Sequence, residues 1–104
     1  MFKNLKNKKN EEKLLVDSQT IKEMTVKCDL LINMCDITRV KEAIRVLKDE
    51  IAYLKLSSKP EAKTLEKKIS NKLDDLKLCM TKEEKAILAI NDIKKMVKER
   101  DIIA

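Results

Sequence analysis

Glycine and histidine are both absent from the 104 residues of this chain, which also holds only one proline and two aromatic residues, Phe2 and Tyr53. Without glycine there is no phosphate-cradling loop and no dinucleotide-binding fingerprint. Without histidine the commonest general base and the usual nitrogen ligand of zinc and haem iron are missing. These absences argue against an enzyme, and we expect no cofactor, no metal and no small-molecule substrate.

Charged residues make up 40% of the chain and hydrophobic residues 43%. Few aromatic residues and no glycine leave little material for a sheet, whereas lysine, leucine and glutamate are typical of helices. The hydrophobic share is close to that of ordinary globular domains, and about 100 residues suffice for one modest core. We therefore expect an all-α fold, an antiparallel bundle of three to four helices with coiled-coil-like packing.

The net charge is +6, from 24 lysine and arginine against 18 aspartate and glutamate residues. The surplus is spread along the chain, and only Arg39, Arg45 and Arg100 are arginines, the residue best suited to phosphate and guanine contacts. This favours a soluble, lysine-rich surface over a nucleic-acid face. Weak nucleic-acid binding through lysine-rich helix faces is the alternative hypothesis, and it predicts an affinity that falls steeply with salt.

The three cysteines, Cys28, Cys35 and Cys79, show no Cys-x-x-Cys spacing. Cys28 and Cys35 are two helical turns apart, about 10 Å along the axis, which is too far for a disulfide within one helix. We interpret them as small buried hydrophobes in a reducing compartment. With no apolar signal region near Met1 and no long apolar run, we expect a cytoplasmic protein.

The first residues are rich in lysine and asparagine and poor in large apolar groups. We expect residues 1–17 to form a basic flexible tail and 18–104 to form the bundle. Four lysines could contact an anionic lipid surface or nucleic acid: Lys3, Lys6, Lys8 and Lys9. The acidic Glu11 and Glu12 that follow favour a solubilising tail instead.

Apolar residues three and four apart predict a first helix over 18–35. Every second residue from 24 to 34 is also apolar, which is the period of a strand. No other segment offers such a strand a partner, so a helix that is apolar around most of its circumference is the better interpretation.

The apolar rhythm then slips by two residues, which predicts a break near Asp36 and a second helix over 38–56, capped by Asp36 or Thr38. Ser58 and Pro60 predict the start of a third helix over 60–79, with Ser58 as its cap. Thr81 and Glu84 form a capping box that predicts a fourth helix over 82–101. A single helix over 61–101 is the alternative, because the apolar row nearly continues through this region.

The apolar surface of the first and fourth helices exceeds what one stripe per helix would bury, and surplus of this kind marks an interface. We therefore predict a non-enzymatic protein–protein interaction module whose partner is another protein or a second copy of the chain, which would give a homo-oligomer. The candidate interface residues are Met24, Leu30, Leu31, Ile32, Met34, Ile87, Ile90, Ile93 and Val97.

Overall fold

The computed structural model describes the backbone of residues 2–104 and the side chains of residues 14–104. It has four α-helices and one short 3-10 turn and, over the described residues, no strand: α1 (Phe2–Met34), α2 (Thr38–Ala52), α3 (Pro60–Leu76), η1 (Lys77–Cys79) and α4 (Glu83–Ile103). The helices pack against one another, which confirms the predicted all-α bundle. Residues 24–34, for which a strand was considered, are helical. The alternative of a single helix over 61–101 is wrong, because α3 and α4 are separate helices.

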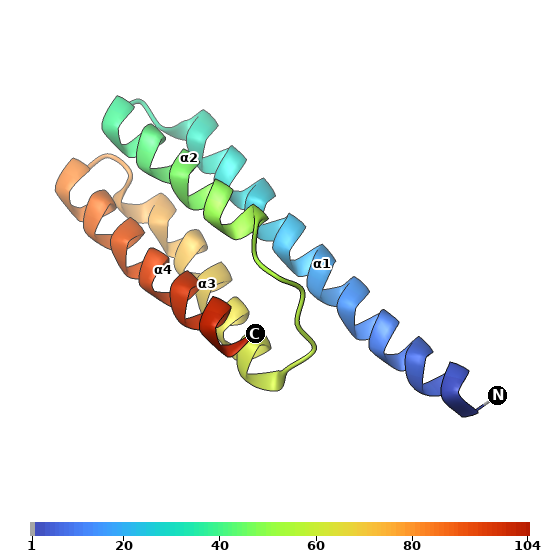
Figure 1. Cartoon of the computed structure of the whole chain (residues 1–104). Helices are drawn as coiled ribbons and strands as arrows, with labels where there is room; N and C mark the ends of the chain where they lie inside the picture. The colour runs from blue at the N-terminus through green and yellow to red at the C-terminus, as the bar shows by residue number, and fades with distance from the viewer. Residues whose placement is uncertain (1) are drawn as a thin grey trace.

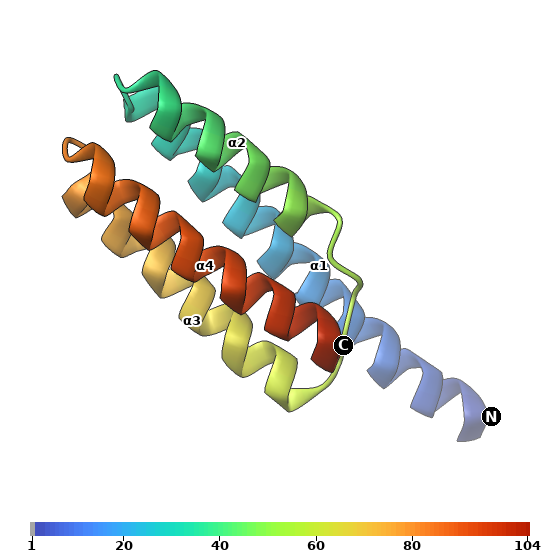
Figure 2. The ribbon, with the colours of Figure 1, turned by 60° about the vertical axis from the view of Figure 1, so that its left-hand side comes forward.

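Two helical hairpins, α1–α2 and α3–α4, lie side by side in Figures 1 and 2. Their tight turns are at the same end of the bundle, while the C-terminus and the connection from α2 to α3 are at the other. α1 packs against α2 and α3, and α4 packs against the same two helices. At the end away from the turns, α1 continues beyond the other helices, which gives the molecule a longest extent of 56 Å (Figures 1 and 2).

The core consists of apolar side chains three and four residues apart, drawn from all four helices. In α2 these are Val40, Ile44, Leu47 and Ile51, all fully buried, as the periodicity predicted. The other buried apolar residues of the helices include Ile21, Met24, Cys28, Leu31, Ala62, Ile69, Leu73, Leu76, Ala86, Ile90, Ile93 and Val97. Each fully buried leucine or isoleucine contributes about 1.5–3 kcal/mol relative to an exposed one. Rows on four helices therefore build one continuous core.

The helix boundaries differ from the predicted ones by more than one residue in four places. α3 ends at Leu76 rather than at 79, where the 3-10 turn η1 follows. α1 begins at Phe2 rather than at 18, so the expected border between tail and bundle falls within a helix. α2 ends at Ala52 rather than at 56, because Leu54 turns into the core and the chain must cross to the other hairpin. α4 continues to Ile103. The side chains of Lys3, Lys6, Lys8 and Lys9 lie outside the described residues, and flexibility of residues 1–17 stays a prediction.

The predicted helix caps are wrong. The N-cap positions are Ile37, Lys59 and Lys82, and none of them makes a side-chain capping hydrogen bond. At the first turn, the loop between α1 and α2 is so short that Ile37 packs against the core at the capping position. Pro60 does occupy the first turn of α3, as expected, where its missing N–H costs nothing.

Candidate functional site: the outer face of α1 and a buried polar cluster

Most of the predicted interface residues lie inside the bundle. Five are buried in the core: Met24, Leu31, Ile90, Ile93 and Val97. Ile32 and Ile87 are half-buried and pack against that core. Only Leu30 and Met34 remain well exposed, by 51% and 59%. The exposed apolar surface is smaller than the sequence predicted, because four helices, each with two neighbours, bury more than one apolar stripe per helix.

Leu30 and Met34 belong to a row of exposed apolar side chains on α1 that begins at Val26, which is 48% exposed. Further towards the N-terminus, Leu15 and Val16 are also more than half exposed. At about 100° per residue these five positions fall within one sector roughly 100° wide, opposite the buried side of the helix. We call these five residues the outer apolar face of α1.

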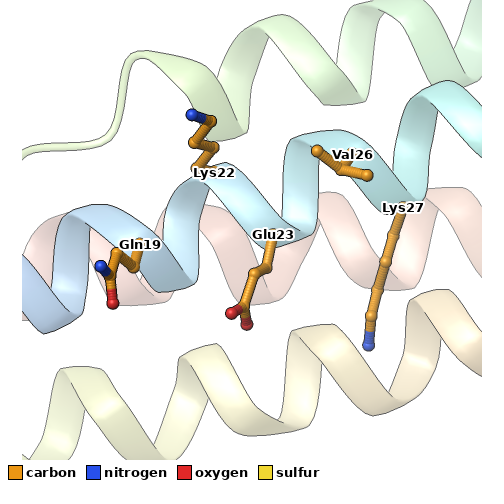
Figure 3. Close-up of a pocket in the computed structure, with 5 residues that line it drawn as sticks. All are labelled: Gln19, Lys22, Glu23, Val26 and Lys27. Atoms are coloured by element: carbon orange, nitrogen blue, oxygen red, sulfur yellow. The ribbon is translucent and has the colours of Figure 1, made fainter.

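A shallow hollow of about 610 Å³ lies in the middle of this face. Its lining residues are Gln19, Lys22, Glu23, Val26 and Lys27. Figure 3 shows Lys22 directed towards the α2 side, and Glu23 and Lys27 directed towards α3, so that Val26 lies between charged flanks. A second hollow, of about 380 Å³, is lined by Leu14, Leu15, Ser18 and Leu56, where the α2–α3 connection passes α1.

Ion pairs on both flanks hold α1 to its neighbours. The Nζ of Lys27 donates to Ser70 Oγ at 2.7 Å and to Asp74 Oδ2 at 3.0 Å, both on α3. On the other flank, Lys48 Nζ of α2 lies 2.6 Å from Asp29 Oδ1, and this hydrogen bond raises the pKa of Lys48. These pairs are partly exposed and screened by solvent, so each contributes little to the stability of the fold. Their effect is to fix the orientation of the outer apolar face.

A buried polar cluster joins four segments at the end of the bundle away from the tight turns. Asp17 of α1 accepts hydrogen bonds through Oδ2 from the Ser57 N–H at 2.7 Å and from Arg100 Nη2 at 3.1 Å. Glu66 of α3 accepts through Oε2 from Arg100 Nε at 3.3 Å, and Arg100 Nη2 lies 3.3 Å from the same oxygen. All four residues are at least 95% buried. We call Asp17, Ser57, Glu66 and Arg100 the polar cluster.

The polar cluster holds two carboxyl groups against one guanidinium. Burial raises the pKa of Glu66 to about 7, helped by hydrogen bonding to Asp17 and repulsion from its charge, while Arg100 opposes the rise. Among the described side chains, Asp17 Oδ1 and Arg100 Nη1 are buried without a hydrogen-bond partner. A buried polar atom without a hydrogen-bond partner costs free energy, so these two atoms reduce the stability that the cluster gives to the fold.

Sequence reasoning missed the polar cluster, although a signal was present. Asp17 lay in the segment expected to be a flexible tail. Glu66 and Arg100 stand at core spacing, four residues after Ala62 and three after Val97. A charged residue inside an otherwise apolar row indicates a buried ion pair, because a lone buried charge is too costly to keep.

Cys28 and Cys35 are buried free thiols, as the sequence predicted, and Cys79 is half-buried. Burial raises the pKa of Cys28 to about 12, and the neighbouring Asp29 charge adds to the rise while Lys48 opposes it. Because the thiolate is the reactive form, Cys28 is chemically inert in the folded chain.

We expect one thiol to react with Ellman's reagent in the folded protein and three after unfolding. Cys79 is the half-buried thiol and should react first, whereas Cys28 and Cys35 are buried and should react only after unfolding. Peptide mapping after alkylation identifies the site. Labelling of Cys28 before Cys79 in native buffer would contradict the packing described here.

No group of three or more metal-ligating side chains comes together among the residues whose side chains are described. Within the same part of the chain, no helix combines the length and the apolarity needed to cross a membrane. No protein-family model matches the chain, and it shows no significant similarity to a curated protein or to a solved structure.

Proposed function

We propose that this protein is a non-enzymatic helical interaction module and that the outer apolar face of α1 is its contact surface. The observation that carries the proposal is the row Val26, Leu30 and Met34, spaced four residues apart and each about half exposed. Contiguous exposed apolar side chains on a rigid helix are a recurring feature of helix-mediated recognition. The three free thiols suit a reducing compartment, and we place the protein in the cytoplasm.

The face is preformed, which favours binding. Met24, Cys28 and Leu31 anchor the opposite side of the same helical turns in the core. Ion pairs to α2 and α3 hold both flanks. A partner therefore would not have to order this helix, so the entropic cost of association is lowered.

We infer that the partner is a second copy, arranged with its α1 antiparallel. The charges on the flanks of the row are self-complementary in that arrangement. Lys22 and Asp29, seven residues apart, share one flank, and Glu23 and Lys27 share the other. In an antiparallel helix pair each flank faces the same flank of its partner, so opposite charges meet. A parallel pair would instead bring Lys22 towards Lys27 of the second copy.

Nucleic-acid binding through lysine-rich faces is the second candidate, and the structure offers it less support. Lys27 and Lys48 are engaged in ion pairs with Asp74 and Asp29. The charge of these two lysines is therefore partly neutralised, and the other lysines are distributed over all four helices.

Light scattering over a range of concentrations tests self-association. We expect a mass near twice the 12.1 kDa of one chain at roughly 100 µM protein. Replacing both Leu30 and Met34 by lysine should return the mass to 12.1 kDa, because two charges would be buried without partners.

The matched control replaces Leu88 and Ile102 by lysine, since both are at least as exposed but lie on α4. This variant should associate as the native chain does. A native chain that stays at 12.1 kDa, or a control as impaired as the α1 variant, would refute the proposed surface.

A further inference from the structure

We propose that Asp17, Glu66 and Arg100 form a proton-dependent latch. While Glu66 is protonated, the latch fixes α1 and the 53–59 connection to the α3–α4 hairpin, and it loosens when that proton leaves.

The geometry around Arg100 is the first argument. Its Nη2 atom lies 3.1 Å from Asp17 Oδ2 and 3.3 Å from Glu66 Oε2, so two buried carboxyl groups converge on one nitrogen. With both ionised, the cluster has a net charge of −1 in a site closed to water. One proton on Glu66 makes the cluster neutral and supplies the donor for the hydrogen bond between the Glu66 and Asp17 carboxyl groups.

The groups facing Glu66 come from both neighbouring helices of α3. Asp17 on α1 favours the protonated form, and Arg100 on α4 favours the ionised form. Burial is the largest cause of the shift, and the balance of these effects raises the pKa of Glu66 from 4.5 to about 7. The folded chain therefore keeps this proton to a higher pH than the unfolded chain. The resulting stabilisation is complete below about pH 4.5 and is lost as the pH rises through about 7.

The position of the cluster determines what is released. Its Asp17 accepts a hydrogen bond from the Ser57 N–H of the α2–α3 connection at 2.7 Å. Figure 1 shows that α1 continues beyond the other helices at the end of the bundle where this connection runs. The tight turns at the opposite end of the bundle contain none of its members. Loss of the proton should therefore loosen residues 14–20 and 53–59 while the rest of the bundle stays folded.

Carbon-13 NMR of the glutamate side-chain carboxyl carbons tests the proton directly in the native chain. We expect Glu66 to titrate with a midpoint near 7. A Glu66 midpoint at the ordinary value of 4.5 would overturn the proposal without any variant.

Hydrogen exchange tests the release. Between about pH 5.5 and about pH 8.5, the protection factor of the Ser57 amide should fall about tenfold or more and should stay below that of the Ile44 amide in α2, a core amide that we expect to exchange through opening of the whole bundle. The Glu66→Gln variant is permanently neutral and should abolish this fall. The control Glu99→Gln, at an exposed position of the same chain, should preserve it. A native Ser57 amide whose protection does not depend on pH would refute the latch.

Discussion

Replacing Arg100 by methionine is expected to lower the free energy of unfolding by about 3–5 kcal/mol. Arg100 is fully buried and is the guanidinium shared by Asp17 and Glu66. Methionine keeps much of the volume but leaves two carboxyl groups in the core without their cation. Urea unfolding followed by circular dichroism near neutral pH measures the loss, and the loss should grow as the pH rises because more of Glu66 is then ionised.

Arg45→Met is the matched control for that experiment. Arg45 also pairs with a glutamate, Glu42 at 2.6 Å, but both side chains are more than half exposed. An exposed pair of this kind contributes about 1 kcal/mol or less. Equal destabilisation by the two substitutions would show that the polar cluster does not hold the end of the bundle together.

Leu31→Ala is the second substitution with a large expected effect, a loss of about 2–5 kcal/mol. Leu31 has no exposed surface and packs in the continuous core, so truncation removes buried methyl groups and leaves a cavity. The midpoint of urea unfolding, with the slope unchanged, reports the loss.

The adjacent Leu30 provides the control on the same helical turn. It is 51% exposed, and Leu30→Ala in the monomer should cost about 1 kcal/mol or less. The contrast between neighbours tests which face of α1 is buried. If Leu30→Ala were the more damaging change at a concentration where the chain is monomeric, α1 would have to be rotated about its axis relative to this structure.

The sequence predicted the fold class and the start of the third helix because both depend on local signals. Periodic rows such as Val40, Ile44, Leu47 and Ile51 point to one side of a helix in any helical arrangement. Pro60 at the start of α3 is similarly local. Glycine is the residue that most readily adopts positive φ, and the sequence contains none. Accordingly, no described residue has positive φ.

The site depended on tertiary arrangement, which periodicity alone does not determine. Met24 and Leu30 look equivalent along an apolar helix, but Met24 is fully buried whereas Leu30 is 51% exposed. Which side of α1 packs against α2 and α3 depends on how the two hairpins pack together. The N-terminal part of α1 has no apolar row, so its helical continuation from Phe2 had no periodic signal.

The polar cluster depends on contacts across 34 to 83 positions of sequence. Asp17, Glu66 and Arg100 meet only once both hairpins are in place. The charged residues at core spacing in α3 and α4 indicate that buried charges are present. The sequence does not indicate which residue pairs with which.

The oxidation rate of Met34 tests most directly whether the outer apolar face of α1 is a contact surface. Met34 is 59% exposed on that face, and the fully buried Met24 on the same helix serves as an internal reference. Hydroxyl-radical footprinting with peptide mapping measures both at rising protein concentration. We predict that Met34 oxidation falls roughly threefold or more as association proceeds, while Met24 stays protected throughout. A Met34 rate that remains constant up to the concentration at which the mass doubles would show that the chains meet elsewhere.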